Sequence, residues 1–167
     1  MRSKRPSGYT LIELMITLAV VAALLTMAWP SFQESLRGNR VATSNNEVLA
    51  SLSLARTEAI KGLGPAGVCP SSSGTACTST TDWAAGWIVW RDERTATGTN
   101  RVVVRYIQPR AQTTMTGPAG GIQFTTQGRA QSGAAQVSVA PYGVSSPARC
   151  IRVSSAGQTR TSQAACS

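Results

Sequence analysis

One apolar run near the N-terminus constrains the fold of this chain more than any other feature. Residues 9–29 form a stretch of 21 residues in which Glu13 is the only charged side chain. A helix rises about 1.5 Å per residue, so a helix of this length spans the hydrocarbon core of a bilayer, which is roughly 30 Å thick. The sequence therefore predicts one membrane-spanning helix at the start of the chain.

A short basic segment before this helix indicates its orientation. Arg2, Lys4 and Arg5 precede the apolar run, and such positive flanks stay on the cytoplasmic side of the membrane. We therefore expect the rest of the chain on the opposite side. A secretory signal peptide has a shorter apolar region that ends at a small-residue cleavage site. Here the small residue, Gly8, comes before the apolar run, so cleavage after it would leave the helix attached.

Glu13 requires an explanation, because a carboxylate at the centre of a bilayer costs about 2.5–3.5 kcal/mol on insertion scales. One interpretation is that Glu13 lies near enough to the interface to reach the headgroups. The other is that it pairs with an amine. Cleavage between Gly8 and Tyr9 would create a new amino terminus four residues before Glu13. A pair between that amine and the carboxylate of a neighbouring subunit would satisfy both charges.

The N-terminal residues resemble a known family. The stretch SGYTLIELMITLAVVAALLTMAWP, with its basic leader, glycine before an aromatic residue and T-L-x-E-L motif, is similar to the N-terminus of type IV prepilins. The resemblance covers roughly residues 4–32. It implies cleavage after Gly8 by prepilin peptidase, N-methylation of Tyr9, and a role for Glu13 in aligning each incoming subunit with its neighbour.

The apolar pattern predicts that the helix continues beyond the bilayer. Apolar residues at three-, four- and seven-residue spacing form one stripe on the helix surface; they are Val41, Val48, Leu52, Ala55 and Ala59. The sequence GLGPAG at 62–67 then supplies a helix stop. We therefore divide the chain into a leader (1–8), a membrane half of the helix (9–30), a soluble half (31–62) and a β-rich globular domain (63–167).

Alternating β-branched residues after the helix predict strands. The predicted strands are residues 86–92, 101–108, 121–126, 136–141 and 149–155. The polar segment DERTATGTN at 92–100 has the length and composition of a hairpin loop. Several such strands beside one helix indicate an α+β domain with antiparallel sheets.

The soluble part narrows the resemblance. The segments SLSLARTEAIK (51–61), WAAGWIVWRDERTATGTN (83–100) and CIRVSSAGQTR (150–160) resemble the FimT/FimU minor pilins and the GspH pseudopilins. This resemblance implies a pilin-like fold in which a long N-terminal helix packs on a small antiparallel β-sandwich. It also implies that other pilin subunits are partners.

The four cysteines, Cys69, Cys77, Cys150 and Cys166, all follow the membrane helix and lie on the expected external side. An oxidising compartment favours disulfides. Three connectivities are possible, and we favour Cys69–Cys77 with Cys150–Cys166, because each pair brackets a Ser/Thr-rich segment. A metal site is the alternative, but the chain has no histidine and no C-x-x-C spacing.

The sequence offers little for catalysis or for a cofactor. No histidine is present to act as a general base, and we expect the cysteines to be oxidised. The adjacent acids Asp92 and Glu93 are the remaining candidates, and they fall in the predicted hairpin loop, where a solvated turn explains them. We therefore expect a protein that is not an enzyme.

The charge distribution is more informative. After Glu93 the chain has no acidic residue, but it has eight arginines. A one-sided run of charge produces a positive field that attracts polyanions, and guanidinium groups match phosphate oxygens well. A solvated basic surface is the alternative interpretation.

The resemblance to FimT-type minor pilins, which take up DNA in natural transformation, implies a double-stranded DNA partner and a C-terminal G-R-x-R motif for the contact. The corresponding residues here are Gly157-Gln158-Thr159-Arg160, so Arg160 matches and Gln158 replaces the first arginine. Arg149 and Arg152 precede this motif and are candidates to supply the missing charge. A Cys150–Cys166 disulfide would close a loop that presents Arg152 and Arg160, and Arg129 is a further candidate.

Two hypotheses from different classes follow. In the first, the protein is a minor pilin that captures extracellular DNA through arginine-rich C-terminal loops. In the second, it is a structural minor pilin or secretion pseudopilin that primes fibre assembly without binding DNA. In both, the subunit is expected in the inner membrane with a periplasmic domain before assembly, and in an extracellular fibre afterwards if that fibre is a pilus.

Overall fold

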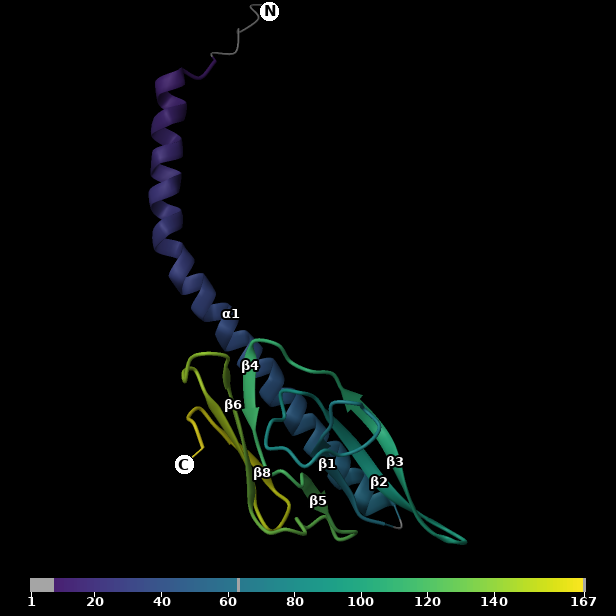
Figure 1. Ribbon diagram of the computed structural model, residues 1–167. Helices are drawn as coiled ribbons and strands as arrows, with labels where there is room; N and C mark the ends of the chain where they lie inside the picture. Colours follow the sequence, from purple (N-terminus) through teal and green to yellow (C-terminus); the bar gives the residue numbers. More distant parts are fainter. Residues whose placement is uncertain (1–7, 63, 167) are drawn as a thin grey trace, which may run out of the picture. The chain divides into compact units, whose positions relative to one another are not determined.

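The computed structural model describes residues 8–62 and 64–166. Within these residues the chain forms one helix, α1 (Leu11–Lys61), and eight strands, which are drawn in Figure 1. The strands are β1 (Ala66–Pro70), β2 (Trp87–Thr95), β3 (Gly98–Ile107), β4 (Thr113–Thr116), β5 (Ile122–Phe124), β6 (Ala135–Pro141), β7 (Arg149–Val153) and β8 (Thr159–Ser162).

Local sequence signals explain where α1 begins and ends. The Thr10 hydroxyl accepts a hydrogen bond from the Glu13 backbone N–H at 3.3 Å, which is the arrangement of a helix N-cap. Pro30 lies inside the helix without ending it. At the far end the Gly62 N–H donates to the Glu58 carbonyl at 2.8 Å, and the glycines and proline that follow do not extend the helix.

The chain divides into two compact units at Leu36. In the first unit none of the described residues is buried. Its most apolar 18-residue window has a mean hydropathy of 2.4, and α1 is long and apolar enough to cross a membrane. Large side chains such as Leu11 and Trp29 are exposed. The residues of this unit therefore make no core of their own, as expected of a helix whose surroundings are lipid or neighbouring subunits.

The second unit, residues 37–167, contains the hydrophobic core. Every residue of the predicted helical stripe from Val41 to Ala59 has an exposed fraction of 0%, which confirms that prediction. These side chains pack with Trp87 and Phe124 from one group of strands and with Val137 and Ile151 from another. All core side chains lie between Val41 and Val153, so a chain that begins at residue 31 retains the whole core.

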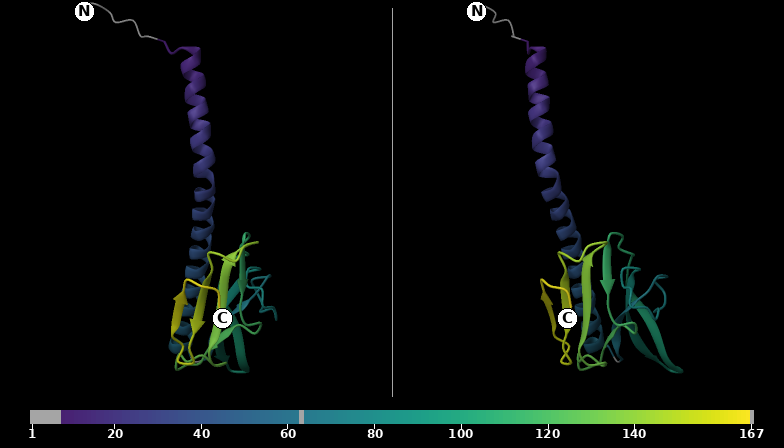
Figure 2. Two further views of the ribbon diagram at one scale, coloured as in Figure 1. Left: turned by 90° about the vertical axis from the view of Figure 1, so that its left-hand side faces the viewer. Right: turned by 60° about the vertical axis from the view of Figure 1, so that its left-hand side comes forward.

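The strands form two antiparallel sheets, which Figure 2 shows beside α1. The first sheet has the order β3-β2-β1-β5 and the second has the order β4-β6-β7-β8. All adjacent strands in both sheets pair antiparallel. This architecture confirms the predicted α+β class, with a long helix packed on antiparallel sheets.

Three strands, β1, β4 and β8, were not predicted from the sequence. Strand β1 is buried along its whole length, so it shows no alternation, and it begins inside the segment predicted only as a helix stop. Strands β4 and β8 are four residues long and have the sequences TTMT and TRTS. Such short polar segments carry almost no periodic signal. The five strands that were predicted correspond to β2, β3, β5, β6 and β7.

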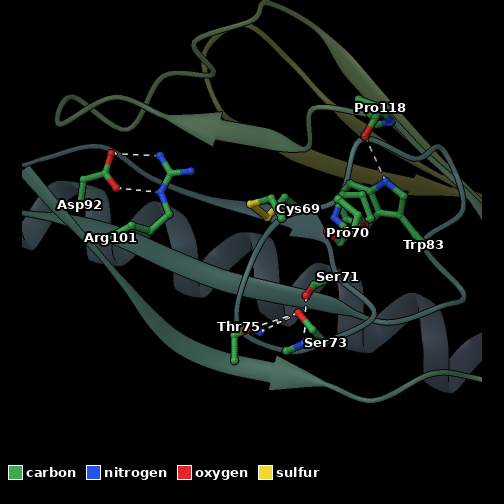
Figure 3. Close-up of a disulfide and its surroundings, with 12 residues drawn as sticks. Cys69, Pro70, Ser71, Ser73, Thr75, Trp83, Asp92, Arg101 and Pro118 are labelled. Carbon is green, nitrogen blue, oxygen red and sulfur yellow. Dashed lines mark hydrogen bonds and ion pairs between the residues drawn. A yellow bond between two sulfur atoms is a disulfide. The ribbon is translucent and has the colours of Figure 1, made fainter.

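A hairpin is present at the place predicted, 92–100, but its loop is much shorter than the sequence suggested. Strand β2 continues to Thr95 and β3 begins at Gly98, so most of this segment is paired. A cross-strand ion pair stabilises the extension, since the Arg101 guanidinium donates to both Asp92 carboxylate oxygens at 2.9 and 3.2 Å, as Figure 3 shows. The Arg101 guanidinium also lies 3.6 Å from the centre of the Trp90 ring.

The structure contains both disulfides favoured from the sequence. Cys69 is bonded to Cys77, and Cys150 is bonded to Cys166. The first joins β1 to the loop before β2, on the side of the first sheet that carries a small cluster of Cys69, Ile88 and Trp90. The second joins β7 to the C-terminal tail, so the end of the chain is tied to the second sheet.

Candidate nucleic-acid interface

Arg152 and Arg160 lie directly opposite each other on paired strands of the second sheet. Their Cα atoms are partners in the antiparallel register of β7 and β8. Both residues lie between the bonded cysteines Cys150 and Cys166, as expected from the sequence. They are not on irregular loops, however, because Arg152 belongs to β7 and Arg160 to β8. The two arginines are therefore positioned by a β-sheet rather than by a flexible loop.

A tight turn between β7 and β8 sets this register. The Ser154 N–H donates to the Gln158 carbonyl at 2.9 Å, and the Gly157 N–H donates to the Ser154 carbonyl at 2.8 Å. Gly157 has a φ of +76°, and a Cβ atom there would collide with the Gly128 carbonyl oxygen. Only glycine meets both conditions without strain. The G-Q-T-R segment is thus the end of this turn and the start of β8.

Strand alternation directs both arginines away from the core. Ile151 and Val153 are 0% and 1% exposed, whereas Arg152 between them is exposed. Side chains point alternately to the two faces of a strand, and residues directly opposite each other share a face. Arg152 and Arg160 therefore lie together on the outer face of the second sheet. We call these two residues the arginine pair.

The arginine pair borders an open surface groove of about 660 Å³. On β6 the register partner of Arg152 is Gln136, which also lines the groove. The other polar side chains in its lining are Ser154, Gln158, Thr161 and Ser162. The groove thus combines two guanidinium groups with amide and serine hydroxyl groups, which can donate hydrogen bonds to phosphate oxygens. The Thr161 hydroxyl donates instead to Asn45 Oδ1 at 2.9 Å.

Arg129 lies on a turn next to the β7–β8 turn. The turn is closed by the Thr125 N–H, which donates to the Arg129 carbonyl at 2.9 Å, and the Ala130 N–H donates to the Ser155 carbonyl at 3.1 Å. The Arg129 side chain is exposed. The structure therefore brings this residue to the same end of the second sheet as the β7–β8 turn.

Arg149 does not join the arginine pair. It is three residues before Arg152 on the same strand, so alternation places the two on opposite faces. Its register partner is the fully buried Val139, and Arg149 itself is half-buried. The structure therefore does not bring Arg149 together with Arg152 and Arg160.

Other arginines have carboxylate partners that the sequence did not reveal. Among the eight arginines after Glu93, Arg101 pairs with Asp92 and Arg110 pairs with Glu47. The partners precede the acid-free segment, and Arg110 and Glu47 are 63 residues apart. Counting charges along the sequence therefore overestimates the positive field around the first sheet and its neighbouring loops.

Arg91 forms a further ion-pair group between β2 and α1. It contacts Glu58 at 2.8 Å and Glu93 at 2.5 Å. The hydrogen bond that Arg91 donates to Glu58, followed by those that it donates to Glu93, raises the pKa of the Arg91 guanidinium. Arg91 therefore links the β2–β3 hairpin to the last turns of α1. Its guanidinium charge is already paired with two carboxylates.

The N-terminal candidate residues are all exposed. Tyr9 is 86% exposed, Gly8 precedes the helix, and Glu13 lies in its first turn. The basic leader residues Arg2, Lys4 and Arg5 lie outside the described residues. In the described part of the chain no three His, Cys, Asp or Glu side chains lie close enough together to hold a metal ion.

Comparison with known families gives two matches along the chain. A family model described as "Type II transport protein GspH" matches residues 44–157. A second model, described as "Prokaryotic N-terminal methylation motif", matches residues 3–29. No curated protein sequence matches the chain.

Solved structures with the same fold include two proteins from bacterial surface systems. The type IV minor pilin FimU of Pseudomonas aeruginosa is 19% identical, with a TM-score of 0.58 over 74% of this chain and 89% of that one. The minor pseudopilin EpsH from the Type 2 Secretion System of Vibrio cholerae is 12% identical, with a TM-score of 0.54 over 77% of this chain and 98% of that one. At these identities the likeness establishes the fold.

Proposed function

Because the chain belongs to the GspH family, we propose that it is a minor pilin of the FimU type that joins or primes a type IV pilus and binds extracellular double-stranded DNA. The observation that carries the DNA proposal is the arginine pair on the outer face of a sheet whose strands contain no acidic residue. The proposed setting is natural transformation, with the pilus carrying the subunit outside the cell.

The N-terminal residues support a defined route into the fibre. Prepilin peptidase removes residues 1–8, the new amino terminus on Tyr9 is methylated, and residues 9–30 hold the subunit in the inner membrane. Residues 31–62 then join this anchor to the β-rich domain of residues 63–167. In the fibre the Glu13 carboxylate pairs with the amine of a neighbouring subunit, because an unpaired charge in an apolar surrounding is costly.

Replacement of Glu13 tests the assembly step. Glu13→Ala is expected to insert into the inner membrane and to be processed, but to enter fibres poorly, which immunoblots of sheared fibres measure. Gly8→Val is expected to remain unprocessed in the membrane, and it separates loss of processing from loss of pairing. Normal incorporation of processed Glu13→Ala would contradict the pairing role.

The geometry of the arginine pair suits a phosphate backbone. Directly opposed residues of an antiparallel pair have Cβ atoms about 4.5–5.5 Å apart, so the two guanidinium groups can reach neighbouring phosphates of one strand. Contacts to phosphate position a protein on DNA without reading its sequence. We therefore expect weak binding with little sequence preference and a strong dependence on salt.

A salt titration of residues 31–167 tests this proposal. Arg152→Gln combined with Arg160→Gln is expected to reduce the slope of log affinity against log salt by about 2, since each lost phosphate contact reduces it by about 1. The matched control is Arg94→Gln with Arg105→Gln, which removes the same charge from exposed positions of the first sheet. Equal slopes for the two double variants would overturn the arginine pair as the contact.

The structural alternative has its own support. The family model that covers most of the domain is that of a type II transport protein, and EpsH is a minor pseudopilin of the Type 2 Secretion System. A subunit of that kind joins a short secretion fibre without binding DNA. Absence of DNA binding at low salt, together with normal fibre incorporation, would favour this alternative.

A further inference from the structure

The connection between β6 and β7 exposes apolar side chains at the end of the domain where α1 enters. Tyr142 is 74% exposed and Val144 is 42% exposed. The same connection passes close to the helix, since a Cβ atom added at Gly38 would lie 4.0 Å from the Pro147 ring. In Figure 1 this connection is the yellow-green segment after β6, beside α1.

The backbone of this connection is held in place while its apolar side chains remain uncovered. The Tyr142 N–H donates to the Gln112 carbonyl at 3.0 Å. Gly143 has a φ of +76°, and no atom lies within 4 Å of where its Cβ would be. The turn is thus held by a backbone hydrogen bond at Tyr142, while the Tyr142 and Val144 side chains are exposed.

Two exposed arginines of α1 lie close to Gly38 in the sequence. Arg37 and Arg40 lie one residue before and two residues after Gly38. Neither forms an ion pair with any residue that the structure describes. Arg37, Arg40, Tyr142 and Val144 all belong to the second unit. We call these four residues the helix-entry patch.

The chain itself limits how far this patch lies from a bilayer. Gly38 follows Pro30, the end of the proposed membrane half, by eight residues, which is about 12 Å of helix. The headgroup region on each side of the hydrocarbon core is about 5–7 Å thick. A turn beside Gly38 that carries a tyrosine side chain is therefore within reach of the headgroups.

We propose that the helix-entry patch docks on the anionic headgroups of the membrane before the subunit is assembled. The inference rests on the membrane anchoring in the proposed function and adds a second contact to it. Tyrosine is enriched at the membrane interface because its ring is apolar and its hydroxyl is polar. Basic residues close to a bilayer are attracted to anionic lipids. Docking would hold the domain in one orientation until extraction into the fibre breaks the contact.

Hydrogen exchange of the full chain in lipid nanodiscs tests this proposal. Peptides covering residues 142–147 are expected to exchange several-fold more slowly in discs with phosphatidylglycerol than in discs with phosphatidylcholine alone. Tyr142→Ser with Val144→Ser should remove the difference, and Arg37→Gln with Arg40→Gln should reduce it. Val104→Ser is the matched control, since Val104 is an exposed valine on β3, and it should retain the full difference.

The outcomes separate this proposal from the proposed function. Equal exchange rates in the two kinds of disc, with the chain inserted, would overturn lipid docking by the helix-entry patch. The proposals of membrane anchoring and DNA binding would be unaffected. Slower exchange only in discs that hold two copies would assign the patch to subunit contact and overturn lipid docking. A chain that does not insert at all would contradict the membrane anchor and the patch together, whereas DNA binding is measured on residues 31–167.

Discussion

The two sheets use arginine in opposite ways. In the first sheet Arg91 contacts Glu58 and Glu93, and Arg101 contacts Asp92. The strands of the second sheet contain no aspartate or glutamate, and their arginines share the sheet with Thr, Ser and Gln. The same residue type therefore closes local ion pairs on one sheet and leaves a net positive face on the other.

This difference shows that the position of the acids, not the number of arginines, determines where a polyanion can bind. An arginine that contacts two carboxylates is part of a neutral or negative group and contributes little field beyond it. The strands that carry the arginine pair, β7 and β8, contain no acid. The sharpest experiments alter one sheet and measure both stability and DNA affinity.

The largest expected effect separates the two faces of β7. Ile151→Ala deletes a fully buried side chain and is expected to lower the free energy of unfolding by about 2–5 kcal/mol, because it leaves a cavity in the core. Arg152→Gln, one residue along, should change stability by less than about 0.5 kcal/mol, as for most surface substitutions. Chemical denaturation of both variants measures the difference.

DNA affinity should show the reverse order. At temperatures where Ile151→Ala remains folded, it should bind DNA like the original chain, whereas Arg152→Gln should bind more weakly. A loss of affinity in folded Ile151→Ala that matches the loss in Arg152→Gln would mean that the outer face of β7 is not a separate binding surface.

The next effect concerns the disulfide that ties the C-terminus to the second sheet. Cys150 and Cys166 are separated by 16 positions, and removing a cross-link over a loop of that size costs about 3 kcal/mol in the chain-entropy model. Replacing both with serine is expected to lower the denaturation midpoint. Hydrogen exchange should accelerate in β8 more than in β1. Uniform acceleration over both sheets would contradict a local role for this disulfide.

The sequence predicted those parts of the fold that have a regular pattern. The buried stripe of α1 follows a helical period, and β6 alternates buried and exposed residues, so both were found. Strand β1 is buried throughout and β8 is polar, so neither has a period to detect. Both disulfides were also predicted correctly, from the Ser/Thr-rich segment that each pair of cysteines brackets.

The candidate site was predicted in part, and the missing part depends on tertiary structure. Arg152 and Arg160 were selected from their place in the C-terminal segment, but their register depends on a turn that Gly157 and the neighbouring Gly128 define. Arg149 was selected in the same way, but the strand alternation that separates it from Arg152 became evident only once β7 was aligned with the core. The contact between Arg110 and Glu47 joins residues 63 positions apart, which no local pattern reveals.

The smallest expected effect tests the first sheet directly. Arg101→Gln removes an ion pair with Asp92 and a contact with the Trp90 ring. Both are at the surface, where such interactions contribute about 1 kcal/mol together, so the midpoint of unfolding should fall slightly, and Arg101→Lys should recover part of the loss. DNA affinity should change much less than in Arg152→Gln, although each variant loses one positive charge, because the Arg101 charge is already offset by Asp92. If Arg101→Gln weakens DNA binding as much as Arg152→Gln does, the proposed difference between the two sheets in DNA binding is wrong. Total charge would then govern the affinity.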